Sequence, residues 1–336
     1  MEAFVFDRIG EPSEVLERRT VPDPEPGPGE VLVRVILSPV HPPDLHLMRG
    51  RFARRPPLPT SPGMECVGVV ETLGPGVEGL DVGTRVVLID VWGSWAERIV
   101  APAARTVPVP RGISDEDAAQ AIQSPVTAWI LAMLEHRMQP GEWLAQTAAG
   151  STVGRLVLQI ARHRGFRTIN LVRRPEQTTE IEALGGDVVL CTEDADWPQR
   201  FSEAADGAAP TKAIDCVAGR VGATVAGHLA PGGRLIVYGA LSSHRKTEPE
   251  AFELPIFAPR LIYAATTVQG WLLFHWLDAR PLEERRAVVG TVLGHLASGV
   301  MRLPPAIRYR PEEIGAALET AEAGGRVGKP LLDFSA

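Results

Sequence analysis

The pattern of apolar and polar positions is most regular between residues 143 and 174. The apolar run at 143–147 predicts a buried strand, and small residues follow it as far as Gly154. Apolar side chains then recur at helical spacing until Gly165, a residue type that ends helices. The β-branched run at 168–172 predicts a second strand. This order of strand, tight turn, helix and strand predicts a βαβ unit.

The turn of this unit has the composition of a phosphate-binding site. The first turn of such a unit presents backbone N–H groups and a helix N-terminus to a pyrophosphate, which large side chains would hold away. The turn keeps no strict G-x-G-x-x-G pattern, but all its residues are small. We therefore expect a dinucleotide to contact Gly150, Ser151, Thr152 and Val153.

Two arginines follow the second strand of the unit. Enzymes that use NAD usually carry an acidic residue there, which accepts hydrogen bonds from the ribose 2′-hydroxyl. This chain has Arg173 and Arg174, and no acidic residue comes before Glu176. Planar guanidinium groups suit a 2′-phosphate, so we expect the cofactor to be NADP(H). A solvated pair of surface arginines is the alternative.

Composition narrows the class of protein. The 336 residues suffice for two domains, and 45% of them are hydrophobic. A net charge of −7 gives no support to a nucleic-acid or anionic-membrane partner. The longest apolar segment, 261–277, contains Gln269, Gly270 and His275, and the N-terminus has no basic, signal-like segment. We expect a cytoplasmic protein that acts on a small molecule and does not contact a membrane.

The spacing of the strand-like runs predicts an α/β fold in two domains. Residues 1–118 contain short apolar runs separated by Pro and Gly, which is typical of a β-rich domain. Residues 119–298 alternate strand and helix, which predicts a doubly wound parallel sheet of the Rossmann type. Strand-like runs at 304–309 and 329–334 follow a helix at 282–298. We expect residues 299–336 to return to the first domain and make it discontinuous.

Over nearly its whole length the sequence resembles the medium-chain dehydrogenase/reductase superfamily, in particular its zinc-independent quinone reductase and mitochondrial-type 2-enoyl reductase branch. The resemblance implies a GroES-like catalytic domain, an inserted Rossmann domain and hydride transfer from NADPH to an electron-poor acceptor. It is carried by the following short segments and single residues: His41-Pro-Pro-Asp44, Gly50, Gly63-Met64-Glu65, Gly68, Ser124-Pro-Val-Thr127-Ala128, residues 148–154, Arg173, Tyr238-Gly-Ala-Leu241, Gly270-Trp271-Leu272, Trp276 and Gly328-Lys329.

The residues do not form the zinc site of related alcohol dehydrogenases. The first two ligand positions are occupied by His41 and Met64, and residues 121–128 contain no cysteine. A tetrahedral zinc site needs three or four converging ligands. We therefore expect no metal, and His41 with His46 and Asp44 is a weak alternative site.

Without a Lewis acid, an acceptor already polarised by conjugation fits best, such as a quinone, an enone or a 2-enoyl thioester. Reduction of the alkene then requires a donor that stabilises the enolate and supplies a proton. The related reductases place a Tyr where this chain has Phe52. The donor that replaces it could be His41, Ser38, Thr127 or a water molecule. His41 is the first candidate, because the resemblance places it facing the cleft, and a structural role for this loop histidine is the alternative. We expect the reduction of quinones to be affected least by the change.

Further positions follow from the resemblance. It places Ser124 and Thr127 near the nicotinamide, with helix capping as the alternative role. Arginines at 49, 51, 54 and 55 are expected either to bind an acyl-CoA or to form a solvated surface. The branch also implies a homodimer. The remaining residues expected to contact the cofactor are Tyr238, Ala240, Leu241, Trp271, Leu272 and Lys329.

Phe52 also motivates a second class of function. A protein that has lost its proton donor can still bind NADPH, as a redox sensor or a binding module with little turnover. Titration of NADPH binding beside an assay of NADPH oxidation distinguishes the two classes.

Overall fold

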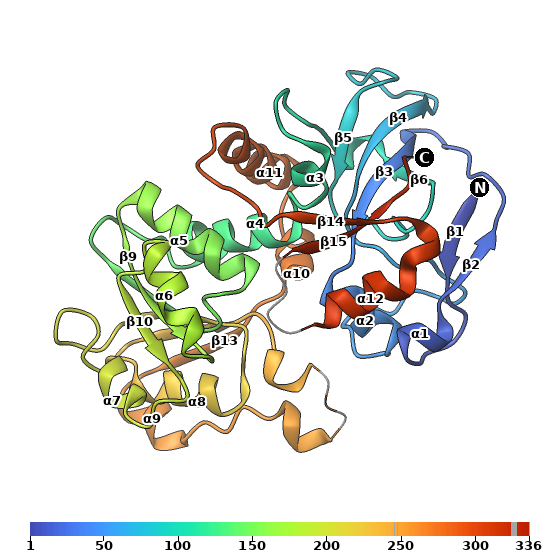
Figure 1. Cartoon of the computed structure of the whole chain (residues 1–336). Helices are drawn as coiled ribbons and strands as arrows, with labels where there is room; N and C mark the ends of the chain where they lie inside the picture. The colour runs from blue at the N-terminus through green and yellow to red at the C-terminus, as the bar shows by residue number, and fades with distance from the viewer. Residues whose placement is uncertain (245, 247, 324–327, 336) are drawn as a thin grey trace. The chain divides into compact units, whose positions relative to one another are not determined.

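A computed structural model describes residues 1–244, 246, 248–323 and 328–335 (Figure 1). Contacts divide the chain into two compact units. Unit 1 comprises Met1–Val126, Leu277–Gly299 and Leu303–Ala336, and unit 2 comprises Thr127–Trp276 and Val300–Arg302. Unit 1 is therefore discontinuous in sequence.

Unit 2 contains a six-stranded parallel sheet in the order β10-β9-β8-β11-β12-β13. The order reverses at β8, as in a doubly wound sheet. Its elements are η2 (Ile130–Glu135), β8 (Trp143–Gln146), α5 (Thr152–Arg164), β9 (Arg167–Val172), α6 (Glu176–Ala183), β10 (Val188–Cys191), α7 (Trp197–Phe201), β11 (Lys212–Asp215), α8 (Gly219–His228), β12 (Arg234–Val237), η3 (Leu241–Ser243), η4 (Pro249–Phe252), α9 (Ala258–Tyr263), β13 (Thr267–Gly270) and α10 (Leu273–Asp278).

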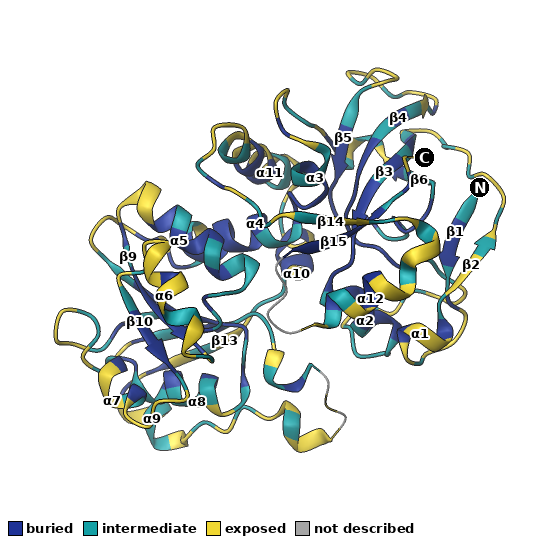
Figure 2. Cartoon of the chain, in the orientation of Figure 1, coloured by how far each residue is buried: buried dark blue, intermediate teal, exposed yellow. Residues whose placement is uncertain are grey.

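The sheet of unit 2 buries both of its faces, because successive side chains of a strand point to opposite sides. Leu171 of β9 packs in one apolar cluster with residues of α7 and α8, and the next residue, Val172, packs in another with α5 and α6. Figure 2 shows these strands as largely buried. Because helices cover both faces of the sheet, its strands are continuous runs of apolar residues and do not alternate apolar with polar residues.

Unit 1 is built around a seven-stranded sheet in the order β14-β15-β3-β4-β5-β7, with β6 also paired to β3. A separate β1-β2 pair lies outside it. The elements are β1 (Glu2–Val5), α1 (Pro12–Val15), β2 (Glu17–Thr20), β3 (Glu30–Pro39), α2 (Pro42–Met48), β4 (Val67–Leu73), β5 (Arg85–Leu88), β6 (Arg98–Pro102), η1 (Ala103–Arg105), β7 (Thr106–Pro108), α3 (Asp115–Ala119), α4 (Gln123–Trp129), α11 (Leu282–Ala297), β14 (Ala306–Tyr309), η5 (Pro311–Glu313), α12 (Ile314–Glu322) and β15 (Lys329–Asp333).

The C-terminal strands join the N-terminal sheet. β15 pairs antiparallel with β3, so that Leu331 lies opposite Pro39, and β14 pairs parallel with β15. Residues 306–309 and 329–333 thus contribute strands to the same sheet as β3.

The expected boundary at residue 298 assigns α11 to the nucleotide-binding part, whereas the contacts of this helix place it in unit 1. The Arg286 side chain donates hydrogen bonds to the carbonyl groups of Ala104 and Thr106, at 2.9 and 2.7 Å. The sequence pattern predicts the helix, but it does not show which sheet the helix packs against.

Among the residues described, none of the helices is both long enough and apolar enough to cross a lipid bilayer.

Candidate functional site

The turn after β8 in unit 2 brings backbone close to backbone. Ala148 has φ +47°, which turns the chain sharply at the end of the strand. A Cβ atom added to Gly154 would lie 2.5 Å from the carbonyl oxygen of Ala149, closer than carbon and oxygen approach. Only glycine at this position lets α5 start directly against the turn. This is the geometry that brings backbone N–H groups to a pyrophosphate.

The N-terminus of α5 is capped by the turn itself. The Ser151 hydroxyl accepts a hydrogen bond from the backbone N–H of Gly154 at 3.2 Å, as an N-cap residue does. The first N–H groups of a helix, here those of Thr152 and Val153, have no acceptor within the helix. Together with the positive end of the helix dipole, they form a site for an anion.

Arg173 and Arg174 follow β9 at the carboxyl edge of the same sheet. Arg173 is exposed and Arg174 is half-buried. Within the part of the chain that the structure describes, neither guanidinium group has an ion-pair or hydrogen-bond partner. Both cations therefore remain available to a phosphate group, one strand away from the phosphate-binding turn.

The other expected cofactor residues of unit 2 lie along the same edge, because each follows the carboxyl end of a parallel strand. Tyr238 follows β12, and its amide donates to the carbonyl of Asp215 at 2.8 Å. The Trp271 amide, after β13, donates to Val237 at 2.8 Å. Burial raises the pKa of the Tyr238 hydroxyl well above its usual value. Three further expected residues adjoin these positions: Ala240, Leu241 and Leu272.

The sequence pattern did not reveal a buried carboxylate at this edge. Asp215 at the end of β11 accepts hydrogen bonds from the Thr147 hydroxyl at 2.6 Å and from the amides of Val217 and Ala218 at 2.8 and 3.0 Å. A Cβ atom on Gly222 would lie 2.1 Å from this carboxylate. Asp215 therefore connects the ends of β8 and β11 and fixes the loop that follows. A lone Asp at the end of an apolar run gives no signal of this role.

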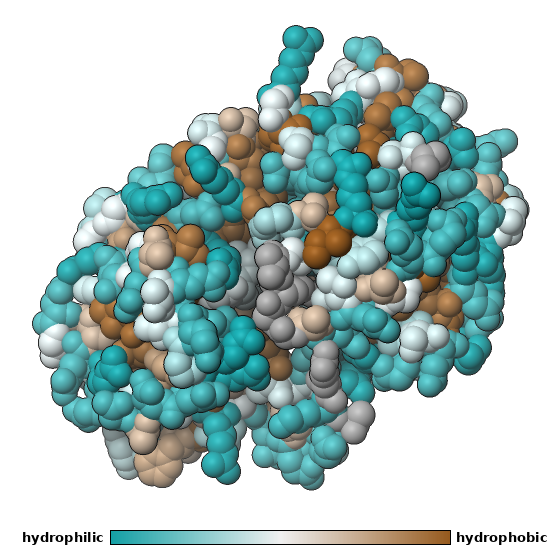
Figure 3. All heavy atoms as spheres, in the orientation of Figure 1, coloured by the Kyte–Doolittle hydropathy of each residue, from teal (hydrophilic) through white to brown (hydrophobic). Residues whose placement is uncertain are grey.

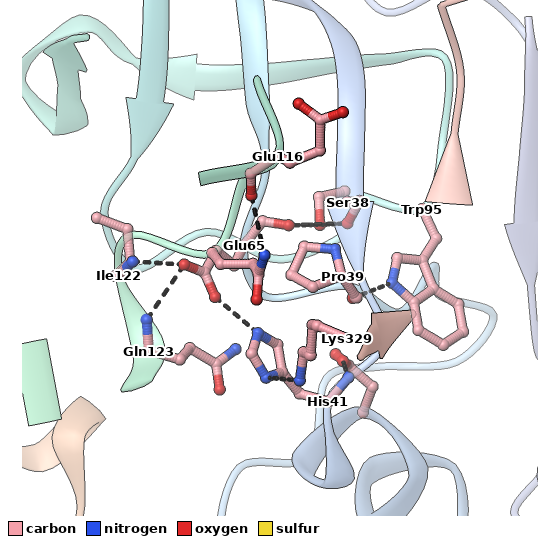
Figure 4. A network of polar contacts seen from close by, with 12 residues as sticks. Ser38, Pro39, His41, Glu65, Trp95, Glu116, Ile122, Gln123 and Lys329 are labelled. Carbon is pink, nitrogen blue, oxygen red and sulfur yellow. Dashed lines mark hydrogen bonds and ion pairs between the residues drawn. The ribbon is translucent and has the colours of Figure 1, made fainter. Parts of the chain in front are cut away.

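Strand register builds the candidate site of unit 1. Because Leu331 of β15 pairs with Pro39 of β3, antiparallel pairing brings Lys329 opposite His41. Glu65 precedes β4, which pairs with the other side of β3. Residues far apart in sequence thus meet at the end of β3 (Figure 4).

Lys329, His41 and Glu65 form a continuous chain of short hydrogen bonds (Figure 4). The Lys329 Nζ is 2.6 Å from His41 Nδ1, and His41 Nε2 is 2.6 Å from Glu65 Oε2. An ammonium group only donates, so Nδ1 accepts and Nε2 carries the proton that it donates to Glu65. All three side chains are buried. We refer to these three residues as the lysine–histidine–glutamate chain.

Glu65 is anchored on all sides by backbone and hydroxyl groups. Its Oε1 accepts from the amides of Ile122 and Gln123, the second at 3.2 Å. Its backbone carbonyl accepts from the hydroxyls of Ser38 and Ser94, at 2.8 and 2.9 Å. Sequence comparison singled out the Gly63-Met64-Glu65 segment, but not Glu65 as a site residue. Its signal is an acidic residue inside an apolar run, which requires a partner when buried.

Burial dominates the electrostatics of the acidic groups. It raises the pKa of Glu65 to about 8 and that of Asp44 to about 7, while the hydrogen bonds they accept and the positive charge of Lys329 lower both. Asp44 Oδ2 accepts from the His41 backbone N–H at 2.8 Å and caps α2. Asp44 therefore orders the start of α2 at His41.

Ser124 and Thr127 both lie inside α4, which begins at Gln123. Neither is therefore an N-cap, and the capping alternative is wrong. Thr127 is buried and Ser124 is half-buried. Ser124 follows directly after Gln123, whose amide binds Glu65.

Phe52 lies in the loop after α2, beside an aromatic residue that the sequence did not indicate. Its ring centroid is 5.9 Å from that of Trp92, at an interplanar angle of 60°. The Arg54 guanidinium lies 5.9 Å from the Trp92 ring centroid and pairs with Asp90 at 2.7 Å. Phe52 therefore belongs to a packed aromatic surface with a cation at its side.

The arginines of this region are mostly engaged within the protein. Arg49 pairs with Glu11 and Glu322, at 2.7 and 2.5 Å, and its side chain is nearly buried. Arg55 donates to the carbonyl of Gly50 at 3.0 Å. With Arg54 paired to Asp90, three of the four arginines are engaged within the protein, which gives little support to an open basic patch for an acyl-CoA phosphate.

The donor set does not fit zinc. The described residues contain no group of three or more His, Cys, Asp or Glu side chains placed to hold a metal ion. Met64 occupies a ligand position as a fully buried apolar side chain, and the Nδ1 of His41 is taken by the Lys329 ammonium.

Comparisons with known proteins agree with this architecture. The family described as "Alcohol dehydrogenase GroES-like domain" matches residues 27–111, and that described as "Zinc-binding dehydrogenase" matches residues 152–287. A mitochondrial enoyl-[acyl-carrier-protein] reductase of Xenopus tropicalis is 30% identical over 98% of this chain and 94% of its own length.

Solved structures extend the likeness to three dimensions. A quinone oxidoreductase of Pseudomonas syringae is 25% identical, with a TM-score of 0.88 over 99% of both chains. A mycobacterial protein solved in complex with NADPH is 28% identical, with a TM-score of 0.85 over 99% of both chains.

Proposed function

Because the chain belongs to the medium-chain dehydrogenase/reductase superfamily, in its zinc-independent quinone and enoyl reductase branch, we propose that it reduces quinones and small enones with NADPH. The observation that carries the proposal is the carboxyl edge of the unit 2 sheet. There a phosphate-binding turn and two unengaged arginines, Arg173 and Arg174, lie on neighbouring strands.

The described residues fit NADPH in two respects. Because Gly154 has no side chain, α5 begins close against Ala149, and no bulky group separates a pyrophosphate from the backbone of the turn. Arg173 and Arg174 suit the 2′-phosphate. When bound, NADPH supplies a hydride to the acceptor. The task of the protein is to orient both molecules and to stabilise the negative charge that develops on the acceptor oxygen.

The missing hydroxyl group at Phe52 determines which acceptors we expect the protein to reduce fastest. A quinone that has received a hydride is a hydroquinone anion, which takes its proton from solvent. An enone or enoyl thioester becomes an enolate and needs a proton at carbon. Phe52 cannot donate one, and the engaged state of Arg49, Arg54 and Arg55 gives little support to an acyl-CoA. We therefore place 2-enoyl thioesters below quinones and enones.

A panel of quinones, enones and enoyl thioesters, each assayed for NADPH oxidation beside an NADPH-binding titration, tests the proposal. We expect micromolar binding of NADPH and the fastest turnover with quinones. Tight NADPH binding without oxidation by any acceptor would support the alternative of a sensor or binding module. Turnover with NADH alone would contradict the cofactor assignment.

We infer that the working form is a homodimer formed through the edge of the unit 2 sheet. β13 is the last strand of that sheet among the described residues, so one row of its backbone groups faces outward. The preceding α9 exposes Ile262 and Tyr263 at 70% and 86%, and Phe257 beside it at 73%. Such an edge strand can pair with the same strand of a second copy across a twofold axis, and the exposed apolar side chains beside it can then be buried between the two copies. In the view of Figure 3 the surface is largely hydrophilic, with hydrophobic residues scattered over it.

A further inference from the structure

The lysine–histidine–glutamate chain contains a proton donor that the sequence comparison assigned to another role. We propose that Lys329 is the general acid that completes the reduction of activated C=C bonds. The proposal rests on the proposed reductase function and deepens it, because it names the group that replaces the hydroxyl missing at Phe52.

His41, the donor expected from the sequence, is not placed to give up a proton directly. Its Nε2 proton is held by Glu65 at 2.6 Å, and its Nδ1 accepts from Lys329 at 2.6 Å. An imidazole with both nitrogens engaged in this way relays charge but does not protonate a third group. The geometry makes His41 a positioning residue for Lys329.

Exposure points to the lysine end of the chain. Glu65, Asp44, Ser38 and Ser94 are completely buried, whereas His41 is 4% exposed and Lys329 is 5% exposed. The Glu65 end is closed by the amides of Ile122 and Gln123 and by the two serines. Because the Glu65 end is closed, we expect an acceptor to approach the chain from the end formed by His41 and Lys329.

The charges around Lys329 suit a proton that is held and then released. Two buried carboxyl groups interact with the ammonium, Glu65 and Asp44, and burial raises the pKa of both. The positive charge of Lys329 favours the ionised forms of both carboxyl groups, whereas burial opposes them. When negative charge develops on an acceptor beside Lys329, the ammonium stabilises that charge and can transfer a proton to the acceptor. These are the two tasks of a general acid.

The reaction balances with one hydride and one proton. The hydride of NADPH forms the new C–H bond at the β-carbon of the enone, and the electron pair of the C=C bond moves into the enolate. Lys329 Nζ–H gives its proton to the α-carbon, and the ammonium becomes an amine. The amine regains a proton from water, so the net reaction consumes NADPH and one proton per enone reduced.

The test compares Lys329→Met, which removes the proton and the charge, with Lys329→Arg, which keeps the charge. A guanidinium releases no proton near neutral pH, because its pKa lies far above that range. The chain has three lysines, and Lys212→Met is a matched control, since Lys212 forms a surface pair with Glu142 at 2.6 Å. Turnover numbers for an enone and a quinone, and the dissociation constant of NADPH, are measured for each variant.

We expect both Lys329 variants to lose about 10²–10⁴-fold in kcat for the enone, the contribution typical of general acid catalysis. The fold-loss in kcat for the quinone should be at least ten times smaller than the fold-loss for the enone. The Lys212→Met variant should behave as wild type. Retention of enone reduction by Lys329→Arg would overturn the proposal in favour of a purely electrostatic role. Equal losses with both acceptors, or weaker NADPH binding with kcat unchanged, would also overturn it.

Two further results keep the proposal testable if the variants fold poorly. In protein labelled with ¹⁵N-histidine, the His41 signal, assigned by its absence from His41→Asn, should show a protonated Nε2 and an unprotonated Nδ1. The opposite tautomer would contradict the hydrogen-bond direction on which the proposal depends. Wild-type protein that reduces quinones but no enone also overturns it, whereas failure with every acceptor would instead refute the reductase function.

Discussion

Lys329 and His41 are 288 residues apart in sequence, yet the Lys329 ammonium nitrogen lies 2.6 Å from His41 Nδ1. The pairing of β15 with β3 creates this contact. The C-terminal strand of the chain therefore completes the polar site that begins at the end of β3. Without β15, His41 would keep its contact with Glu65 but would lose the ammonium group at Nδ1.

The cofactor preference should depend on Arg173. A charge-assisted contact to a phosphate is worth about 1.5–3 kcal/mol, so Arg173→Ala should weaken NADPH binding roughly ten- to a hundredfold and leave NADH binding nearly unchanged. Fluorescence titration with both cofactors measures this. Arg162→Ala is a matched control, because Arg162 is exposed in the last turn of α5, about 15 Å along the helix from Thr152. Equal weakening of both cofactors would refute the 2′-phosphate assignment.

The acceptor preference should respond to a hydroxyl at position 52. Phe52→Tyr adds the donor of the related reductases at nearly constant volume. We expect it to raise kcat for an enoyl thioester more than kcat for a quinone, up to the 10²–10⁴-fold typical of a general acid. Phe252→Tyr, on an exposed ring of unit 2, is the control. If wild type is already fast with enoyl thioesters and Phe52→Tyr is neutral, position 52 has no part in proton transfer.

The phosphate-binding turn should not tolerate a methyl group on Gly154. The added Cβ would lie 2.5 Å from the Ala149 carbonyl oxygen, so Gly154→Ala should lower the free energy of unfolding by about 1–3 kcal/mol and weaken NADPH binding. Thermal unfolding with and without NADPH measures both effects. The same substitution at Gly227, a helical glycine with no atom near its added Cβ, should be neutral or stabilising. Similar results for the two variants would show that the turn is not closely packed.

Asp44 should make the stability of the protein depend on pH. Its pKa is raised from 3.8 to about 7 in the folded protein by burial. A raised pKa contributes stability that is present below pH 4 and is lost as the pH rises towards 7, because the unfolded state releases the proton more readily. Asp44→Asn keeps the acceptor for the His41 amide and removes the titration.

The free energy of unfolding of Asp44→Asn relative to wild type should therefore be more favourable at pH 8 than at pH 4. We expect a difference of more than ~1.4 kcal/mol, the value of one pKa unit. Urea unfolding at both pH values measures it, with Asp81→Asn in an exposed loop as the control. A difference of the opposite sign would show that Asp44 is ionised in the folded protein at pH 4.

The homodimer should depend on the exposed face of α9. Ile262→Asp places a charge on an apolar side chain that is 70% exposed, and it should convert a dimer to a monomer in sedimentation equilibrium. Val82→Asp, at a comparably exposed apolar residue of unit 1, should leave the mass unchanged. A wild-type monomer at micromolar concentration would refute the assembly.

The local pattern of the sequence determined the elements of this protein. The helix α5 ends at Gly165, which has φ +77°, and the strands after it begin within a residue or two of the apolar runs that predict them. Such features depend on neighbours in sequence, since helix periodicity, glycine in left-handed conformation and β-branched runs act over a few residues. The same local signals predict the phosphate-binding turn and the arginines after β9.

The tertiary structure alone decided which polar residues meet. The sequence presents His41, Glu65 and Lys329 in three separate segments, and only the pairing of β3 with β4 and with β15 brings them together. Likewise, Asp215 gains its role from the neighbouring end of β8, and Phe52 its partner from Trp92. Burial then shifts the pKa of Glu65 and Asp44, because the cost of a buried charge depends on everything around it and not on the residues beside it in sequence.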